Sequence, residues 1–136
     1  MKLSLKGKQV AFSIGGETLT VSLRLLTTGE YQELIAYQAQ AGALPVPGET
    51  KEQAASRAQQ TIFNLLRDPE ARAGMYRIVL GAVTRVDPEF DVEDANGKRV
   101  GTVADLMLGA EGSGRFFQLF NAAMAGSSLT ETEAKN

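Results

Sequence analysis

The stretch that decides the fold is QVAFSIGGETLTVSLRLLTTGE, residues 9–30. Apolar residues alternate with polar ones on both sides of Gly15-Gly16, which is the pattern of two strands that each bury one face. A Gly-Gly pair suits the tight turn between such strands, because hairpin turns need positive φ angles. The stretch predicts an N-terminal antiparallel hairpin over residues 10–25. Leu3 and Leu5 begin the same alternation earlier, as a third strand or as the start of the first.

Three helix starts carry recognisable N-cap residues. Thr27 and Glu30 form a capping box, in which each side chain bonds the backbone N–H of the other residue. Gly42 ends the helix that begins there, and a Pro/Gly-rich loop follows over residues 42–49. The other two starts are a second capping box and an Asp-Pro pair, namely Thr50 with Gln53 and Asp68 with Pro69.

The remaining pattern completes a mostly helical body. Apolar residues at 3- and 4-residue steps predict a central helix from residue 69 to Val86, ended by Asp87-Pro88. A small acidic hairpin over residues 90–100, turning at Asn96-Gly97, precedes a short helix capped by Thr102 and a last helix over residues 115–125. The prediction is α+β: an N-terminal antiparallel β-hairpin packed on four to five helices. Residues 1–126 form a single domain, and residues 127–136 form a disordered polar tail.

The composition narrows the classes of function. The chain has 136 residues with no His and no Cys, and its formal net charge is −2. The imidazole base, the thiolate nucleophile and the common zinc, copper and haem ligands are therefore missing. We expect a non-enzymatic protein with no cofactor and no metal site. The N-terminus, MKLSLKGKQVAF, lacks the features of a secretory signal, and no apolar run is long enough for a membrane helix, so we predict a cytoplasmic protein without membrane contact.

Two clusters have a chemical interpretation beside a plainer one. Glycines 109 and 114 have the spacing of a phosphate loop, but Arg115-Phe116 follows where Lys-Ser/Thr is needed, which favours a break between helices. The acidic residues between 87 and 94 do not fit a calcium loop, because counting back from Gly97 puts Val92 at the first ligand position. A solvated turn is favoured, with a docking surface for a basic partner as the alternative.

Two further hypotheses are weaker. Five arginines between residues 57 and 85 lie among acidic residues and without alternating aromatics, which favours solvated helix faces with local ion pairs over a nucleic-acid groove. An enzyme would have to rely on Asp91, Glu93 and Lys98. We therefore expect no nucleic-acid partner and no catalytic residues.

Aromatic residues near the C-terminus are the best candidates for a protein-binding surface. They make the last helix apolar on more than one side, which a single core face does not satisfy. Either all of them are core, or part of the helix covers a partner or a second copy of the chain. Together with residues of the first helix, the candidate partner-binding residues are Tyr31, Leu34, Tyr37, Phe116, Phe117 and Phe120.

In its layout the chain resembles the tail assembly chaperones of long-tailed bacteriophages. The likeness covers most of residues 9–125: a hairpin ending in the apolar strand 19–25, an acidic-capped helix opening Gly29-Glu30-Tyr31, a Pro/Gly loop, a helical body and a polar tail. The resemblance implies a non-enzymatic protein of the host cytoplasm that binds the tape measure protein and helps recruit tail tube protein. It also implies some capacity to self-associate.

Two other functions stay open. The first is a phage virion component, such as a tail completion or head–tail connector protein. The second is a small adaptor or regulatory domain of a bacterium.

Overall fold

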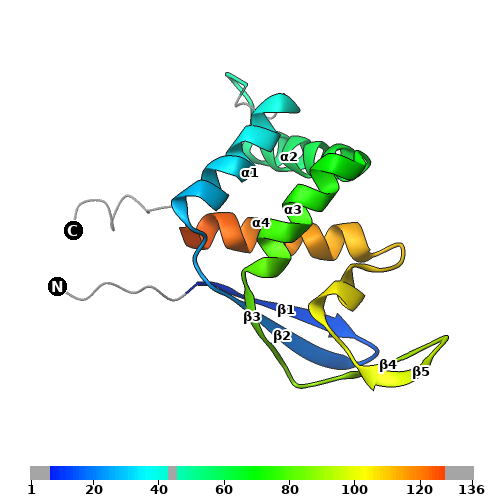
Figure 1. Cartoon of the computed structure of the whole chain (residues 1–136). Helices are drawn as coiled ribbons and strands as arrows, with labels where there is room; N and C mark the ends of the chain where they lie inside the picture. Colours follow the sequence, from blue (N-terminus) through cyan, green and yellow to red (C-terminus); the bar gives the residue numbers. More distant parts are fainter. Residues whose placement is uncertain (1–6, 43–45, 128–136) are drawn as a thin grey trace.

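The computed structural model describes residues 7–42 and 46–127, and it confirms the predicted α+β class (Figure 1). Within those ranges a three-stranded antiparallel sheet and a two-stranded hairpin accompany four α-helices and one 3₁₀ helix. The elements are β1 (Gln9–Ile14), β2 (Glu17–Leu23), α1 (Thr28–Gln40), α2 (Lys51–Leu65), α3 (Pro69–Gly81), β3 (Val83–Asp87), β4 (Asp91–Asp94), β5 (Gly97–Val100), η1 (Val103–Met107) and α4 (Gly112–Ser127).

The N-terminal hairpin forms as the alternation predicts. β1 and β2 pair in an antiparallel register that sets Phe12 opposite Leu19, and Gly15 and Gly16 hold the turn with φ angles of 58° and 82°. The odd-numbered residues of β2 from Leu19 onward are buried, so this face of the sheet packs inward. Leu3 and Leu5 lie outside the described residues.

Helix α4 is the central element. In Figure 1 it lies between the sheet and the layer made by α1, α2 and α3. It contacts β1, η1, α2 and α3, which is why its apolar residues are distributed around more than one side. The prediction that the third helix is central is therefore corrected, because α3 packs mainly on α1 and α4.

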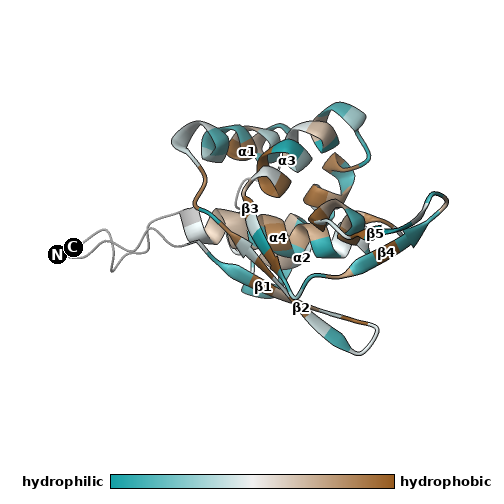
Figure 2. Cartoon of the chain, turned by 60° about the horizontal axis from the view of Figure 1, so that its bottom comes forward, coloured by the Kyte–Doolittle hydropathy of each residue, from teal (hydrophilic) through white to brown (hydrophobic). Residues whose placement is uncertain are grey.

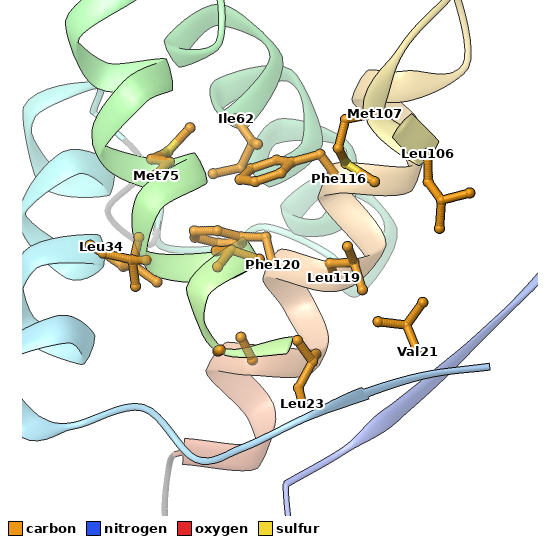
Figure 3. Packing of buried hydrophobic residues seen from close by; sticks show 14 of the residues in the cluster. Val21, Leu23, Leu34, Ile62, Met75, Leu106, Met107, Phe116, Leu119 and Phe120 are labelled. Carbon is orange, nitrogen blue, oxygen red and sulfur yellow. The ribbon is translucent and has the colours of Figure 1, made fainter. Parts of the chain in front are cut away.

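One cluster of buried apolar side chains joins these layers (Figure 3). Its members come from the sheet, from η1 and from every α-helix. Burying each large side chain stabilises the fold by about 1.5–3 kcal/mol relative to leaving it exposed. The largest fully buried side chains are those of Phe116, Phe120, Leu34, Ile62, Met75, Ile78, Leu119, Val21 and Val79.

The predicted helix through Val86 is wrong in its last turn. Helix α3 ends at Gly81, and residues 83–87 form β3, which pairs antiparallel with β2 so that Val86 lies opposite Val21. Two physical reasons favour the strand. The segment is rich in β-branched residues, and β2 would otherwise present an unpaired edge. The helical spacing of apolar residues continues to Val86, but the helix itself ends with Ala82 as its C-cap residue.

The predicted caps are confirmed. The Thr27 hydroxyl accepts from the Glu30 N–H at 3.2 Å, and a Glu30 carboxylate oxygen accepts from the Thr27 N–H at 2.8 Å. Thr50 and Gln53 repeat this box, and Asp68 caps α3 with Pro69 as its first residue. Each such cap stabilises its helix by about 0.5–2 kcal/mol relative to alanine.

Smaller differences concern the second half of the chain. The acidic hairpin exists, but its turn residues are Ala95 and Asn96, and Gly97 already belongs to β5. The short helix after Thr102 is 3₁₀ instead of α, and α4 begins at Gly112, earlier than predicted. Of the predicted tail, only Ser127 lies within the described residues, as the last residue of α4.

Candidate partner-binding surface

Three of the six predicted partner-binding residues are core residues. The exposed fraction is 0% for Leu34, 0% for Phe116 and 1% for Phe120. Figure 3 shows the two phenylalanines on α4 pointing toward α3 and the centre of the cluster. The alternative that these residues are core therefore holds, and none of the three offers a surface to a partner in this fold.

The other three are half-buried. The Tyr37 hydroxyl packs so closely on α3 that a Cβ at Gly74 would overlap it. Phe117 makes an edge-to-face contact with Phe63 of α2, with ring centroids 6.2 Å apart. Tyr31 packs on the edge of the core. Phe117 thus faces α2 while both tyrosines belong to α1, so the structure does not bring the six residues together as one surface.

The large apolar residues that are exposed lie elsewhere. Within the described ranges they are Leu108 (67% exposed), Val100 (57%), Val46 (51%) and Ile35 (42%). Sequence reasoning placed Leu108 in the short helix after Thr102 and did not single it out as a surface residue. The sequence did carry one signal for an exposed apolar residue in this region. Val100 is an apolar residue within an otherwise polar segment.

Leu108 lines an apolar groove of about 330 Å³, which we call the hairpin groove. It lies where the β4–β5 hairpin and η1 adjoin the turn end of the β1–β2 hairpin (Figure 1). Four charged residues, Glu17, Asp91, Asp105 and Arg115, also line it. The apolar lining consists of Ile14, Leu19, Phe90, Val92, Leu106 and Leu108.

The second hairpin is closed at its base by Phe90 and Gly101. The Gly101 N–H donates to the Phe90 carbonyl oxygen at 2.6 Å. The Phe90 ring lies so near the Gly101 backbone that any Cβ there would overlap it. Only glycine therefore fits at this position without displacing the ring. Beyond this base the hairpin extends from the body, and it is largely hydrophilic (Figure 2).

Arg99 joins the second hairpin to η1. Its guanidinium donates to Asp94 at 2.8 Å and forms a two-point ion pair with Asp105. Asp105 also accepts from the Thr102 N–H at 2.7 Å. The hydrogen bonds from Arg99, and then the one from the Thr102 N–H, hold the pKa of Asp105 well below its usual range. The hydrogen bonds to Asp105 and then to Asp94 raise the pKa of Arg99. The ion pair thus fixes the β4–β5 hairpin relative to η1, and both elements line the hairpin groove.

Arg115 anchors the other side of the groove. It donates to the Leu106 carbonyl at 3.2 Å and to Glu111 at 2.8 Å. Both arginines near the groove are thus engaged with acceptors of the same chain. The carboxylates of Glu17 and Asp91, in contrast, make no ion pair with any described residue.

The other sequence hypotheses can be placed as well. The segment that begins at Gly109 connects the 3₁₀ helix η1 to α4, which is the predicted break between helices. No strand of the described residues leads directly into it, whereas a phosphate loop follows a strand. Arg57 pairs with Glu49, Arg77 with Glu33, and Arg85 weakly with Asp87.

Within residues 7–42 and 46–127, no group of three or more acidic side chains is arranged to hold a metal ion. No helix there is long and apolar enough to cross a bilayer.

Compared with protein-family models, with curated proteins and with solved structures, the chain shows no significant match.

Proposed function

We propose that this protein is a tail assembly chaperone of a long-tailed bacteriophage. In this function it binds the tape measure protein, helps tail tube protein assemble, and catalyses no reaction. The observation that carries the proposal is the order of the elements: a β-hairpin leads directly into a capped helix, and a loop and a helical body follow. This is the layout on which the resemblance rests.

The junction between hairpin and helix gives this layout a defined geometry. Arg24, just after β2, forms a two-point ion pair with Glu30, which also caps α1. Leu26, between them, is buried in the core cluster. The hairpin is thereby held at a fixed angle to the helices, and a rigid scaffold lowers the entropic cost of binding a partner.

Exposed apolar side chains also support a protein-binding role. A chaperone for a long helical protein needs apolar anchors that are accessible before the partner arrives, and helix-in-groove binding uses such anchors at helical spacing. Leu108 and Val100 are more than half exposed, and both belong to the region around the second hairpin.

Co-expression tests the proposal directly. The protein is produced together with the long, helical tape measure candidate encoded in its genomic neighbourhood, and the pair is purified and sized by light scattering. We expect the partner to be insoluble alone and to co-purify with this protein in a defined stoichiometry. A partner that is soluble alone and does not associate contradicts the proposal.

Two further observations separate the alternatives. A virion component would be found by mass spectrometry in purified particles, whereas a chaperone would be absent from them. A bacterial adaptor would be encoded away from any tape measure gene.

A further inference from the structure

We propose that the hairpin groove binds a cationic amphipathic helix of a protein partner. The apolar side of that helix enters the groove, and its Lys or Arg residues pair with Glu17 and Asp91. The inference rests on the proposed function in one respect, namely that the partner is a helical protein segment. The site, the chemistry of the ligand and the test are specific to this groove.

The apolar lining provides the first argument. Leu108 is 67% exposed, the largest exposed fraction of any large apolar residue in the described ranges. It lies beside Phe90 and Val92, which are only half-buried, over a floor that includes the buried Leu19 and Leu106. A partner side chain placed there removes apolar surface from water on both molecules, which favours association.

The charges around the groove provide the second argument. Glu17 lies at the start of β2 and Asp91 at the start of β4, so carboxylates from two different hairpins line the same groove. Neither is paired with a cation of the described chain, because Arg99 and Arg115 are engaged elsewhere. A cationic ligand can therefore pair with two carboxylates that have no cationic partner among the described residues, whereas these carboxylates repel an anionic ligand.

The other carboxylates of the acidic segment differ in their ion pairing. Asp87 and Asp94 are balanced by Arg85 and Arg99. Glu89, which is exposed between β3 and β4, makes no ion pair with a described residue. Of the acidic segment that the sequence offered as a docking surface for a basic partner, Asp91 is the residue that lines the apolar groove.

The size of the groove favours side-chain anchors over a complete small ligand. Its volume of about 330 Å³ is near the lower end of the range for small-molecule sites, ~300–1,000 Å³. A helix that inserts a few aliphatic side chains from one face, with flanking lysines at the rim, matches both the volume and the charge.

Binding of two synthetic peptides tests the proposal. The first is a fluorescently labelled amphipathic helix with leucines along one face and lysines beside them, and the second carries glutamate at every lysine position. Fluorescence anisotropy is measured with the full chain. We expect the lysine peptide to bind with an affinity that falls as salt is added, and the glutamate peptide to bind about ten-fold more weakly or not at all.

Matched variants locate the binding. Leu108→Asp is expected to weaken the lysine peptide about ten-fold or more, and Glu17→Gln with Asp91→Asn to weaken it several-fold and flatten the salt dependence. The control for the first is Ile35→Asp, on α1, and the control for the second is Glu52→Gln with Glu70→Gln, also exposed carboxylates. Both controls should bind like the parent. Circular dichroism melts verify that each variant is folded.

The groove proposal is overturned by three results: no binding of the lysine peptide up to about 1 mM, equal binding of both peptides, or full binding by folded Leu108→Asp. These results leave the proposed function standing if the co-expressed partner still associates. Conversely, a groove that discriminates the peptides while no tape measure candidate associates supports the site and contradicts the chaperone function.

Discussion

Arg24 and Glu30 bind each other through two parallel hydrogen bonds across the junction of β2 and α1. Arg24 Nη1 lies 2.9 Å from Glu30 Oε1, and Nη2 lies 3.1 Å from Oε2. Oε1 also accepts the Thr27 N–H, so one carboxylate both caps the helix and fixes the strand beside it. The hydrogen bond from Arg24, and then that from Thr27, lower the pKa of Glu30 to about 2.

This relationship predicts a loss of stability in Glu30→Gln that depends on pH. Glutamine keeps a capping oxygen but loses the charge. Because Arg24 is partly exposed and solvent screens the pair, we expect a decrease of about 0.2–1 kcal/mol in the free energy of unfolding near neutral pH. Urea denaturation of both proteins measures it.

The sign of the pH effect follows from the lowered pKa. The unfolded chain titrates Glu30 near 4.5 and the folded protein near 2, so the stabilisation is complete above the first value and is lost as the pH falls through the second. The difference between parent and variant should therefore shrink between about pH 4.5 and pH 2. A difference that stays constant over this interval contradicts the prediction.

The burial of the α4 aromatics predicts a graded series of alanine variants. Phe120→Ala removes a fully buried ring and should lower the free energy of unfolding by about 3–5 kcal/mol. Phe117→Ala removes a half-buried ring and its contact with Phe63, and should cost less, about 1–3 kcal/mol. Equal losses, measured in urea, would show that Phe117 is as much a core residue as Phe120.

Phe117→Asp tests the earlier hypothesis that this residue binds a partner. If Phe117 forms a partner surface, the variant should lose association while its melting temperature changes little. Since the ring is half-buried against α2, we expect a reduced melting temperature instead. Thermal melts followed by circular dichroism separate the two outcomes.

The contact of Gly101 with Phe90 predicts opposite effects of two glycine-to-alanine substitutions. Gly101→Ala must displace the Phe90 ring and should destabilise the protein by about 1–3 kcal/mol. Gly114→Ala, in α4, meets no atom within 4 Å and should stabilise it by about 0.5–1 kcal/mol. Chemical denaturation of the two variants provides the comparison, and a harmless Gly101→Ala would mean that the ring moves freely.

Arg99 is predicted to hold the second hairpin in place without determining global stability. Arg99→Lys keeps the charge but cannot bond Asp94 and both oxygens of Asp105 together. Amide hydrogen exchange in β4 and β5 should become faster, while the melting temperature changes little. Arg85→Lys, whose contact with Asp87 is exposed and 3.6 Å long, is the control and should leave this exchange unchanged.

Local signals made much of the fold predictable. The Gly15-Gly16 turn and the Thr27 and Thr50 capping boxes depend on residues within a few positions of one another, and each formed where the sequence indicated. The β3 strand depends on a partner about sixty residues earlier, so only its β-branched composition signalled it. Cross-strand NOEs between Val21 and Val86 would verify this pairing.

The candidate surface was harder to predict for the same reason. Ile14 and Leu19 come from the first hairpin, whereas Phe90 and Leu108 come from the second half of the chain, and only the tertiary structure brings them to one groove. Phe116 and Phe120 were ambiguous because an apolar helix face has the same spacing whether it meets a core or a partner. Their burial follows from the central position of α4, which no local pattern encodes.

That central position has a consequence for synthesis on the ribosome. The helix that contacts the sheet, η1, α2 and α3 is also the last helix in chain order among the described residues, so it is made after the elements that it joins. Until α4 emerges, the apolar faces of the earlier elements have nothing to enclose, so the nascent chain can form local hairpins and helices but not its core. The core therefore forms only once α4 has been synthesised, because this helix supplies the apolar surface that the sheet and the other helices enclose.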